Sequence, residues 1–263
     1  MFPIVTIGYM GNNIYPARAG EILRAVVLKR HEGIPISASL ATILVERVFD
    51  AVVMLAFIFL NLGELSRMTS SSGYLGNIRD LAIYGAGIAI VVMVIFITAA
   101  MLPQHTRRVV DWINIRFVPV KLRSKVEGLS YRFLDGLESL RSPLDALMIL
   151  FTSFVIWLLE TVKYWFVMHA FPFVVSFFAL MLNNGISNLA TTLPSAPGYV
   201  GTFEAAGIAV LTAYGIPKEI AAGYTVVLHI ALWLPITLVG FYYFSKEGLK
   251  MGEVSEEAKE AQV

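Results

Sequence analysis

Residues 12–24, NNIYPARAGEILR, bring two arginines and a glutamate together near the N-terminus of a largely apolar chain. Arg18 and Arg24 each lie three residues from Glu21, so a helix would place all three on one side. A guanidinium holds phosphate through paired hydrogen bonds, and a helix N-terminus adds free N–H groups and partial positive charge. The segment therefore predicts a site for a phosphate-like anion. The alternative is that Glu21 only neutralises an arginine.

Glu46, Arg47 and Asp50 form a second charged group, within about one turn of an otherwise apolar helix. Charges inside a membrane span are costly and usually face a cavity or the bundle interior. We expect Arg47 and Asp50 to join Glu21 in lining a path for substrate or protons. The alternative is a self-neutralising cluster in which Glu46 locks its helix to Glu21 or Arg24.

The elements that carry these residues belong in a membrane. Hydrophobic residues make up 57% of the 263 positions and charged residues only 15%, and the mean hydropathy is +0.71. A soluble domain has about 25% charged residues. Four apolar stretches are long enough to approach the roughly 20 residues that span a bilayer: 37–62, 81–102, 144–171 and 220–244. We predict an all-α, polytopic membrane protein.

Two further apolar regions, 1–30 and 176–215, are interrupted by Asn, Pro and Gly and therefore predict re-entrant hairpins of broken helix. GIP at 33–35 recurs at 215–217, and at this offset of 182 residues Arg47 falls opposite His229. Glu21 parallels Glu204 when a short gap is allowed. We therefore predict two inverted repeats with a substrate site at their interface, which adds Glu204 and His229 to that site. Chance similarity of Pro/Gly turns, and a purely structural role for His229, are the alternatives.

The residues expected to shape the two hairpins share turn, capping or cross-linking chemistry. They are Asn12, Asn13, Pro16 and Gly20 in the first region, and Asn188, Pro194, Pro197, Gly198 and Gly201 in the second. The second region has a long apolar lead-in that the first lacks. We therefore expect the fold's N-terminal spans to precede residue 1.

Basic residues set the orientation. The 103–141 loop carries eight arginines and lysines, which predicts a cytoplasmic location, and its partly amphipathic VVDWINIRFVPV is expected on the membrane surface. The C-terminus is then cytoplasmic as well. We assign residues 1–244 to one transmembrane domain and 245–263 to a flexible polar tail.

Several chemistries find no support in the sequence. It has no cysteine, no G-x-x-x-x-G-K-[ST], no H-E-x-x-H and no G-x-S-x-G. We therefore expect no cofactor, no metal and no catalytic residues. Topology explains the basic loop, so we expect no nucleic-acid partner, and the sequence sets no oligomeric state.

NNIYPARAGEILRAVVLKR, followed by ISASLATILVERVFD, resembles the flippase-like transmembrane domain of the lysylphosphatidylglycerol synthases, and LPSAPGYVGTFEAA is similar to that family's second motif. The resemblance covers residues 5–244. It implies a protein of the cell membrane that binds or translocates a polar lipid, either aminoacyl-phosphatidylglycerol or a polyprenyl-phosphate-linked sugar. The alternatives are a membrane module of, or accessory to, a lipid-modifying transferase, and a secondary transporter of a soluble anion.

Overall fold

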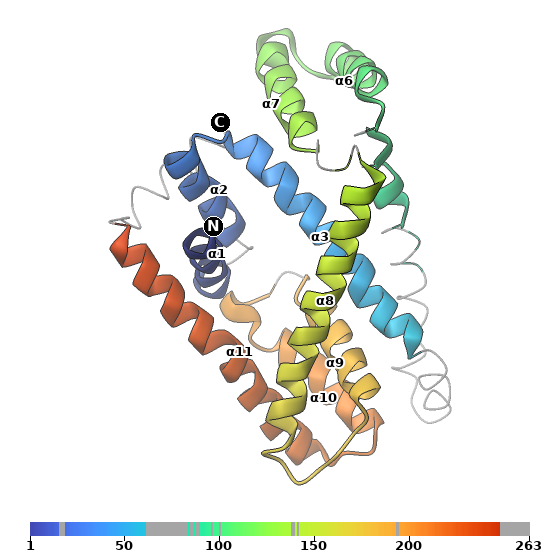
Figure 1. Ribbon diagram of the computed structural model, residues 1–263, viewed down its shortest axis with the longest axis vertical. Coiled ribbons are helices and arrows are strands. Elements are labelled where there is room, and N and C mark those ends of the chain that lie inside the picture. Colours follow the sequence, from blue (N-terminus) through green and yellow to red (C-terminus); the bar gives the residue numbers. More distant parts are fainter. Residues whose placement is uncertain are drawn as a thin grey trace.

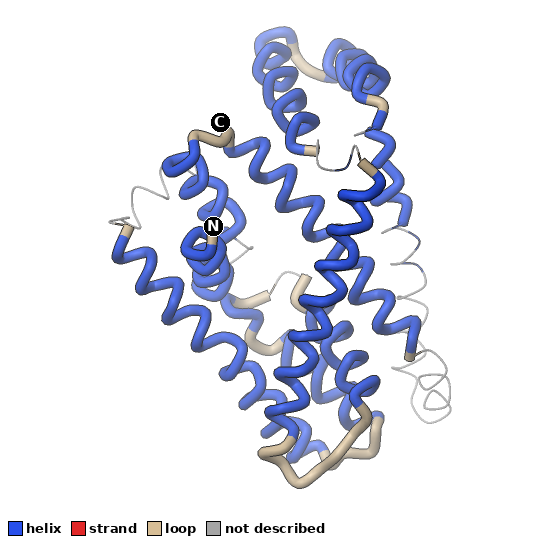
Figure 2. Tube along the Cα trace, in the orientation of Figure 1, coloured by secondary structure: helices blue, strands red, loops and turns tan. Residues whose placement is uncertain are grey.

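The computed structural model describes residues 1–15, 19–61, 84, 87, 90–95, 97–99, 101–137, 140, 142–192 and 195–247, and it leaves out the side chains of residues 121 and 125. Every regular element in this part of the chain is a helix, as the composition predicted (Figure 2). The tail after residue 247, and nine of the 22 residues of the apolar stretch 81–102, lie outside the described residues.

The first broken region forms a helical hairpin. Helix α1 (Phe2–Ile14) packs against α2 (Ala19–Glu32), and the two helix backbones approach each other most closely at Gly20. A Cβ atom built on Gly20 would lie 2.0 Å from the Gly8 carbonyl oxygen and 2.4 Å from the Asn12 nitrogen. The two backbones therefore touch, and only glycine fits at this position.

The second broken region forms a similar hairpin from α9 (Phe177–Ala190), the short 3₁₀ turn η4 (Pro197–Tyr199) and α10 (Thr202–Ala213). Each hairpin continues into a long helix through a Gly-Ile-Pro turn. Gly33 has φ +70° before α3 (Ile36–Leu60), and Gly215 has φ +79° before α11 (Lys218–Lys246). Left-handed glycine ends one helix and proline starts the next.

The tips of the two hairpins meet. In Figure 1, α1–α2 occupies the upper part of the molecule and α9–α10 the lower part, with η4 against the lower end of α1. Asn13 Nδ2 donates to Thr237 Oγ1 at 2.7 Å, and a Cβ on Gly198 would lie 3.2 Å from the Asn13 carbonyl oxygen and 2.9 Å from Trp233 Nε1. Both hairpin tips therefore rest on α11.

Polar side chains join α9 to α8 (Pro143–Met168). Asn184 is fully buried, and its Nδ2 donates to Thr161 Oγ1 at 2.9 Å and to the Trp157 carbonyl at 3.2 Å. Asn188 donates to the Tyr164 hydroxyl at 3.3 Å. Such interhelical bonds hold helices together where apolar packing provides little specificity.

The basic loop forms a separate helical pair, α6 (Pro103–Phe117) and α7 (Arg123–Gly136), which are joined through η2 (Val120–Leu122). This pair projects at the upper end of the molecule (Figure 1). The close approach of Gly136 to Ala41, where a Cβ would lie 2.6 Å from the alanine methyl, packs α7 against α3.

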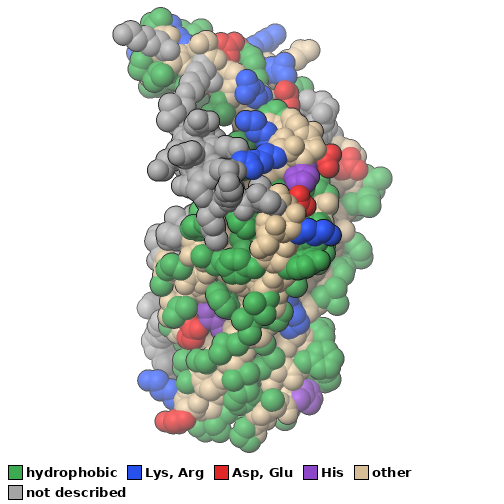
Figure 3. All heavy atoms as spheres, turned by 90° about the vertical axis from the view of Figure 1, so that its left-hand side faces the viewer, with side chains coloured by type: hydrophobic (Ala, Val, Ile, Leu, Met, Phe, Trp, Pro, Cys, Tyr) green, Lys and Arg blue, Asp and Glu red, His purple; other side chains and the backbone are tan. Residues whose placement is uncertain are grey.

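Two described helices, α8 and α11, are long and apolar enough to cross a membrane, and a bent pair, Ile90–Ala99 with Pro103–Phe117, raises the number to three. Helix α3 has 25 residues but carries three charged side chains near its centre. Hydrophobic side chains gather over the face that carries α11, and Lys and Arg lie mainly toward the upper end (Figure 3). The multi-span expectation is thus supported in the part of the chain that the structure describes.

Replacing Gly20 by Ala should force α1 and α2 apart, because the added methyl meets backbone atoms that cannot rotate away. We expect a loss of about 1–3 kcal/mol or more, measured as a lower thermal unfolding midpoint in detergent. Gly128→Ala in α7 is the matched control, since its methyl meets nothing within 4 Å and Ala favours a helix by up to about 1 kcal/mol. Equal midpoints for the two variants would contradict the tight hairpin.

Asn184→Leu should weaken the contact between α8 and α9 by about 0.6 kcal/mol and at most about 1.7. The control is Thr152→Val, because Thr152 is exposed and bonds only to carbonyls of its own helix. Differential scanning calorimetry of both variants in the same detergent, with their thermal unfolding midpoints compared, checks the prediction. A larger loss for Thr152→Val would show that Asn184 does not join the helices.

Candidate functional site

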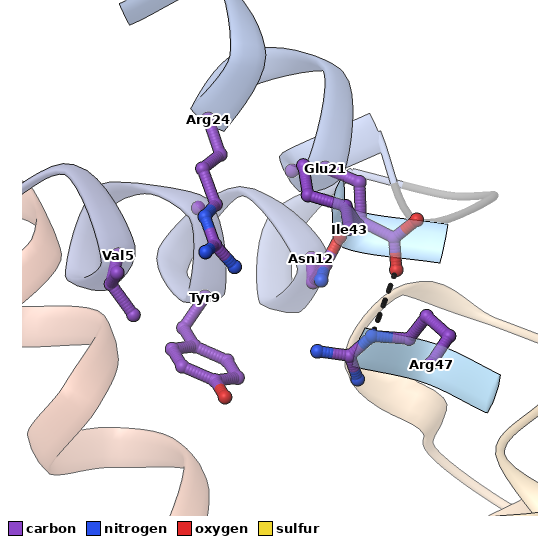
Figure 4. Close-up of a pocket in the computed structure, with 9 residues that line it drawn as sticks. Val5, Tyr9, Asn12, Glu21, Arg24, Ile43 and Arg47 are labelled. Atoms are coloured by element: carbon purple, nitrogen blue, oxygen red, sulfur yellow. Dashed lines mark ion pairs between the residues drawn. The ribbon is translucent and has the colours of Figure 1, made fainter. Parts of the chain in front are cut away.

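A small pocket opens between α1, α2 and α3, on the side of the first hairpin that faces α3 (Figure 4). Its lining combines small, aromatic, amide and charged side chains: Val5, Gly8, Tyr9, Asn12, Gly20, Glu21, Arg24, Ile43 and Arg47. The close packing at Gly20 brings the first turn of α2 beside α1. The charged residues of α2 thus come to face the middle of α3.

Arg47 is the centre of the charged cluster. Its Nη2 lies 2.6 Å from Glu46 Oε1, its Nη1 lies 3.5 Å from Asp50 Oδ2, and its Nε lies 3.8 Å from Glu21 Oε1. Three carboxylates therefore surround one guanidinium, which keeps its charge under any physiological condition. These contacts are those expected if the charged residues of α3 neutralise one another and hold α3 to α2.

Arg24 is less fully engaged. Its Nη1 lies 2.9 Å from Glu46 Oε2, and Glu46 is its ion-pair partner among the described residues. Glu46 thus bridges the arginines of α2 and α3. A guanidinium has five N–H donors in a fixed fork, so Arg24 retains donors for a further anion. Figure 4 shows its guanidinium directed into the pocket, beside the Tyr9 ring.

Asp50 ties the cluster to α8. Its side chain lies deep between helices, with only 9% of the residue exposed, and Trp157 Nε1 donates to its Oδ1 at 2.9 Å. A buried carboxylate is stable only when it is paired and hydrogen-bonded. Asp50 meets this condition through Arg47 and Trp157.

Glu204 and His229 form a separate pair between α10 and α11. One Glu204 carboxylate oxygen contacts His229 Nδ1, and the other accepts the Gly201 N–H at 2.7 Å. Gly201, with φ +91°, is the residue immediately before α10. Because the Glu204 side chain accepts the N–H of Gly201, Glu204 caps the N-terminus of this helix. Phe203 stacks against the imidazole with 4.6 Å between ring centroids. The geometry fits a structural strut as well as a binding group.

The structure thus brings Glu21, Arg24, Arg47 and Asp50 together and places Glu204 with His229 elsewhere. Of the expected hairpin residues, Asn12 lines the pocket, and Asn13 and Gly198 lie at the meeting of the tips. Pro197 begins η4 beside them. Three other predicted residues lie outside the described part of the chain: Pro16, Arg18 and Pro194.

Sequence reasoning missed three aromatic residues that contact these polar groups. Tyr9 lines the pocket, Trp157 holds Asp50, and Trp233 Nε1 donates to the Asn13 carbonyl at 3.4 Å. Tyr9 precedes Asn12 by three positions and so shares its helix face, which was a usable signal. The two tryptophans gave none, because their partners lie 107 and 220 positions away in sequence.

The chemistry available in the pocket is ionic. Within the described residues, no group of three or more His, Cys, Asp and Glu side chains is arranged to hold a metal. Among the described residues, the cluster contains two guanidiniums and three carboxylates: Arg24, Arg47, Glu21, Glu46 and Asp50. The site can therefore offer donors to an anion and acceptors to a cation within one small space.

Comparison with known proteins places the chain. The family model described as "Lysylphosphatidylglycerol synthase TM region" matches residues 1–240. The glycosyltransferase AglD of Haloferax volcanii is 29% identical over 261 residues, which cover 90% of this chain and 41% of that protein. The chain thus spans less than half the length of this relative. No solved structure matches it.

Two relatives are similar over most of their own length. A UPF0104 membrane protein of Methanothermobacter thermautotrophicus is 25% identical over 268 residues, covering 98% of this chain and 76% of the relative. The UPF0104 membrane protein MJ1078 of Methanocaldococcus jannaschii is 25% identical over 248 residues, covering 91% and 96%. As the two motifs predicted, the chain belongs to the lysylphosphatidylglycerol synthase TM region family and is a multi-pass membrane protein.

Proposed function

We propose that this protein is a flippase-like membrane protein without an enzymatic role of its own, which binds and translocates a polar lipid through its phosphate headgroup. The headgroup would enter the polar site while the acyl chains stay in the bilayer. Aminoacyl-phosphatidylglycerol and a polyprenyl-phosphate-linked sugar are the two classes that fit.

The observation that carries this proposal is the position of the charged cluster. Arg24 and Arg47 lie in a pocket beside the meeting point of two broken-helix hairpins (Figures 1 and 4). Irregular backbone at membrane depth is tolerated where it is buried in protein or lines a wet cavity. Transporters place their substrate sites at such interfaces between broken helices.

We further propose that the two halves are inverted repeats. Three features support this: helix–break–helix hairpins that approach from opposite ends, matching Gly-Ile-Pro turns, and an acid–base pair on equivalent helices. In the first half the pair is Glu21 with Arg47, and in the second it is Glu204 with His229. The first half thus carries a guanidinium where the second carries an imidazole.

The contacts suggest different parts for the two arginines. Arg47 already contacts three carboxylates, so its main contribution is to hold the cluster together. Arg24 binds Glu46 through its Nη1 group and can donate its remaining N–H groups to a phosphate oxygen. We therefore assign headgroup binding first to Arg24 and positioning to Arg47.

A second candidate function follows from one comparison. In AglD, named a glycosyltransferase, the region similar to this chain accounts for 41% of the protein. This favours a membrane module that serves a lipid-modifying transferase. Purified protein that translocates lipid without any partner would argue against a purely accessory role.

Arg24→Gln should slow headgroup translocation in proteoliposomes at least tenfold, because charge-assisted bonds to phosphate are worth roughly 1.5–3 kcal/mol, while the fold survives. Arg47→Gln should instead lower stability by about 3 kcal/mol, since it leaves partly buried carboxylates without their cation. Translocation assays and thermal unfolding of the same samples separate the two effects.

The matched control is Arg132→Gln, which removes the same charge from an exposed position on α7, outside the helices that can cross the membrane, and should change neither quantity. Wild-type rates for Arg24→Gln, together with wild-type rates for the conservative Arg47→Lys, would show that the pocket does not bind the headgroup.

The proposed orientation places the α6–α7 pair and the C-terminus in the cytoplasm. The chain has no cysteine, so single substitutions can report sidedness directly. Val174, in the turn before α9, is 85% exposed, and Val174→Cys should react with a membrane-impermeant maleimide in intact cells. Ser124→Cys in α7 should react only after permeabilisation. The reverse pattern would mean that the orientation is inverted.

A further inference from the structure

Helix α6 has an unusual division between its covered and open faces. The face toward α7 makes its side-chain contacts through polar residues, and the face that nothing in the described structure covers carries several large apolar side chains beside arginines. In a surface helix of a soluble protein the apolar stripe faces the core and the polar face meets water. The environment outside α6 is therefore expected to be at least partly apolar.

The covered face is defined by three residues spaced i, i+4 and i+7. Arg107 Nη2 lies 3.1 Å from Asp135 Oδ1, Asp111 accepts a 2.6 Å hydrogen bond from the Tyr131 hydroxyl, and Asn114 Nδ2 donates to the Arg123 carbonyl at 3.0 Å. The hydrogen bond to Asp111 raises the pKa of Tyr131. These contacts fix the rotation of α6 against α7.

The open face is then also defined. Val109, Trp112 and Ile113 are 55%, 62% and 44% exposed, and Phe117 stacks edge-on against Trp112 with 6.1 Å between centroids. Arg116 lies three residues after Ile113 on this same face. An exposed apolar stripe with tryptophan and arginine is typical of helices that lie in the membrane interface.

The direction of α6 agrees with such a position. Helix α6 is bent by 104° from the preceding segment, Ile90–Ala99, and the two together are long and apolar enough to cross a membrane. If that segment crosses the bilayer, α6 runs nearly parallel to the membrane plane. The short connection at Leu102 also holds α6 within reach of the headgroups.

The charges on the open side indicate which lipids it meets. Arg108 and Arg116 are both exposed, and neither forms an ion pair within the described part of the chain. Residues 103–137 contain seven basic and three acidic side chains. Basic residues next to a membrane are attracted to anionic lipids, each by roughly a fivefold factor in binding.

We propose that the open face of α6 is a binding surface for the anionic headgroup layer of the membrane leaflet beside it. Val109, Trp112 and Ile113 insert at the level of the headgroups, and Arg108 and Arg116 bind lipid phosphates. This surface is distinct from the pocket between α1, α2 and α3, and its existence does not depend on the proposed transport function.

The test uses the whole chain, labelled with an environment-sensitive fluorophore at Ile113→Cys and reconstituted in nanodiscs of phosphatidylcholine with or without phosphatidylglycerol. With phosphatidylglycerol present, we expect a blue-shifted emission, quenching by brominated lipid chains and protection from iodide. The same label at Ser124→Cys on α7 should stay exposed to iodide in both lipids. Arg108→Gln and Arg116→Gln should each lower the protected fraction, relative to the exposed fraction, by roughly fivefold.

Arg132→Gln is the matched control, because it removes an equal charge from α7 and should leave the label at position 113 protected. Iodide access at position 113 equal to that at position 124 would overturn the proposal. Equal protection in both lipids would overturn its anionic part. Protection found in native membranes but absent from phosphatidylglycerol nanodiscs would assign the face to a protein partner instead.

Discussion

The fold depends on a charged side chain, Arg47, being held half-buried between apolar helices. An isolated buried ion is prohibitively costly, and a buried pair is tolerated when its geometry and remaining hydrogen bonds are satisfied. Arg47 reaches this condition through carboxylates from its own helix and from α2. Asp50 extends the cluster to α8 through Trp157. One ionic centre therefore sets how the first hairpin, α3 and α8 lie together.

The hairpins supply the space for this centre. Backbone contact at Gly20 brings α1 and α2 so close that the charged side of α2 must face α3. At the other end, Gly198 allows η4 to approach α1 and α11, although less closely than α1 and α2 approach each other at Gly20. Small residues permit such approaches, and polar side chains such as Asn13 then hold them in register. Close backbone packing and polar hydrogen bonds thus occur at the same helix contacts.

Much of this was predictable from local patterns. Hydropathy and charge gave the all-helical membrane class and three of the long helices, α3, α8 and α11, to within a few residues. Pro and Gly marked both breaks, and the Glu46–Arg47–Asp50 spacing indicated a cluster on one helix. What the spacing left open was whether Glu46 turns toward Arg24, because helix periodicity gives faces but not neighbours.

The sequence by itself determined the family, the membrane environment, the broken helices and the residue types of the site. Only the tertiary structure decided that Arg24 and Arg47 share Glu46, that Glu204 both caps α10 and contacts His229, and that Trp157 holds Asp50. Local propensity acts over a few residues and can be read along the chain. Ion pairing in a low-dielectric interior depends on distances between helices, and those distances are set by packing.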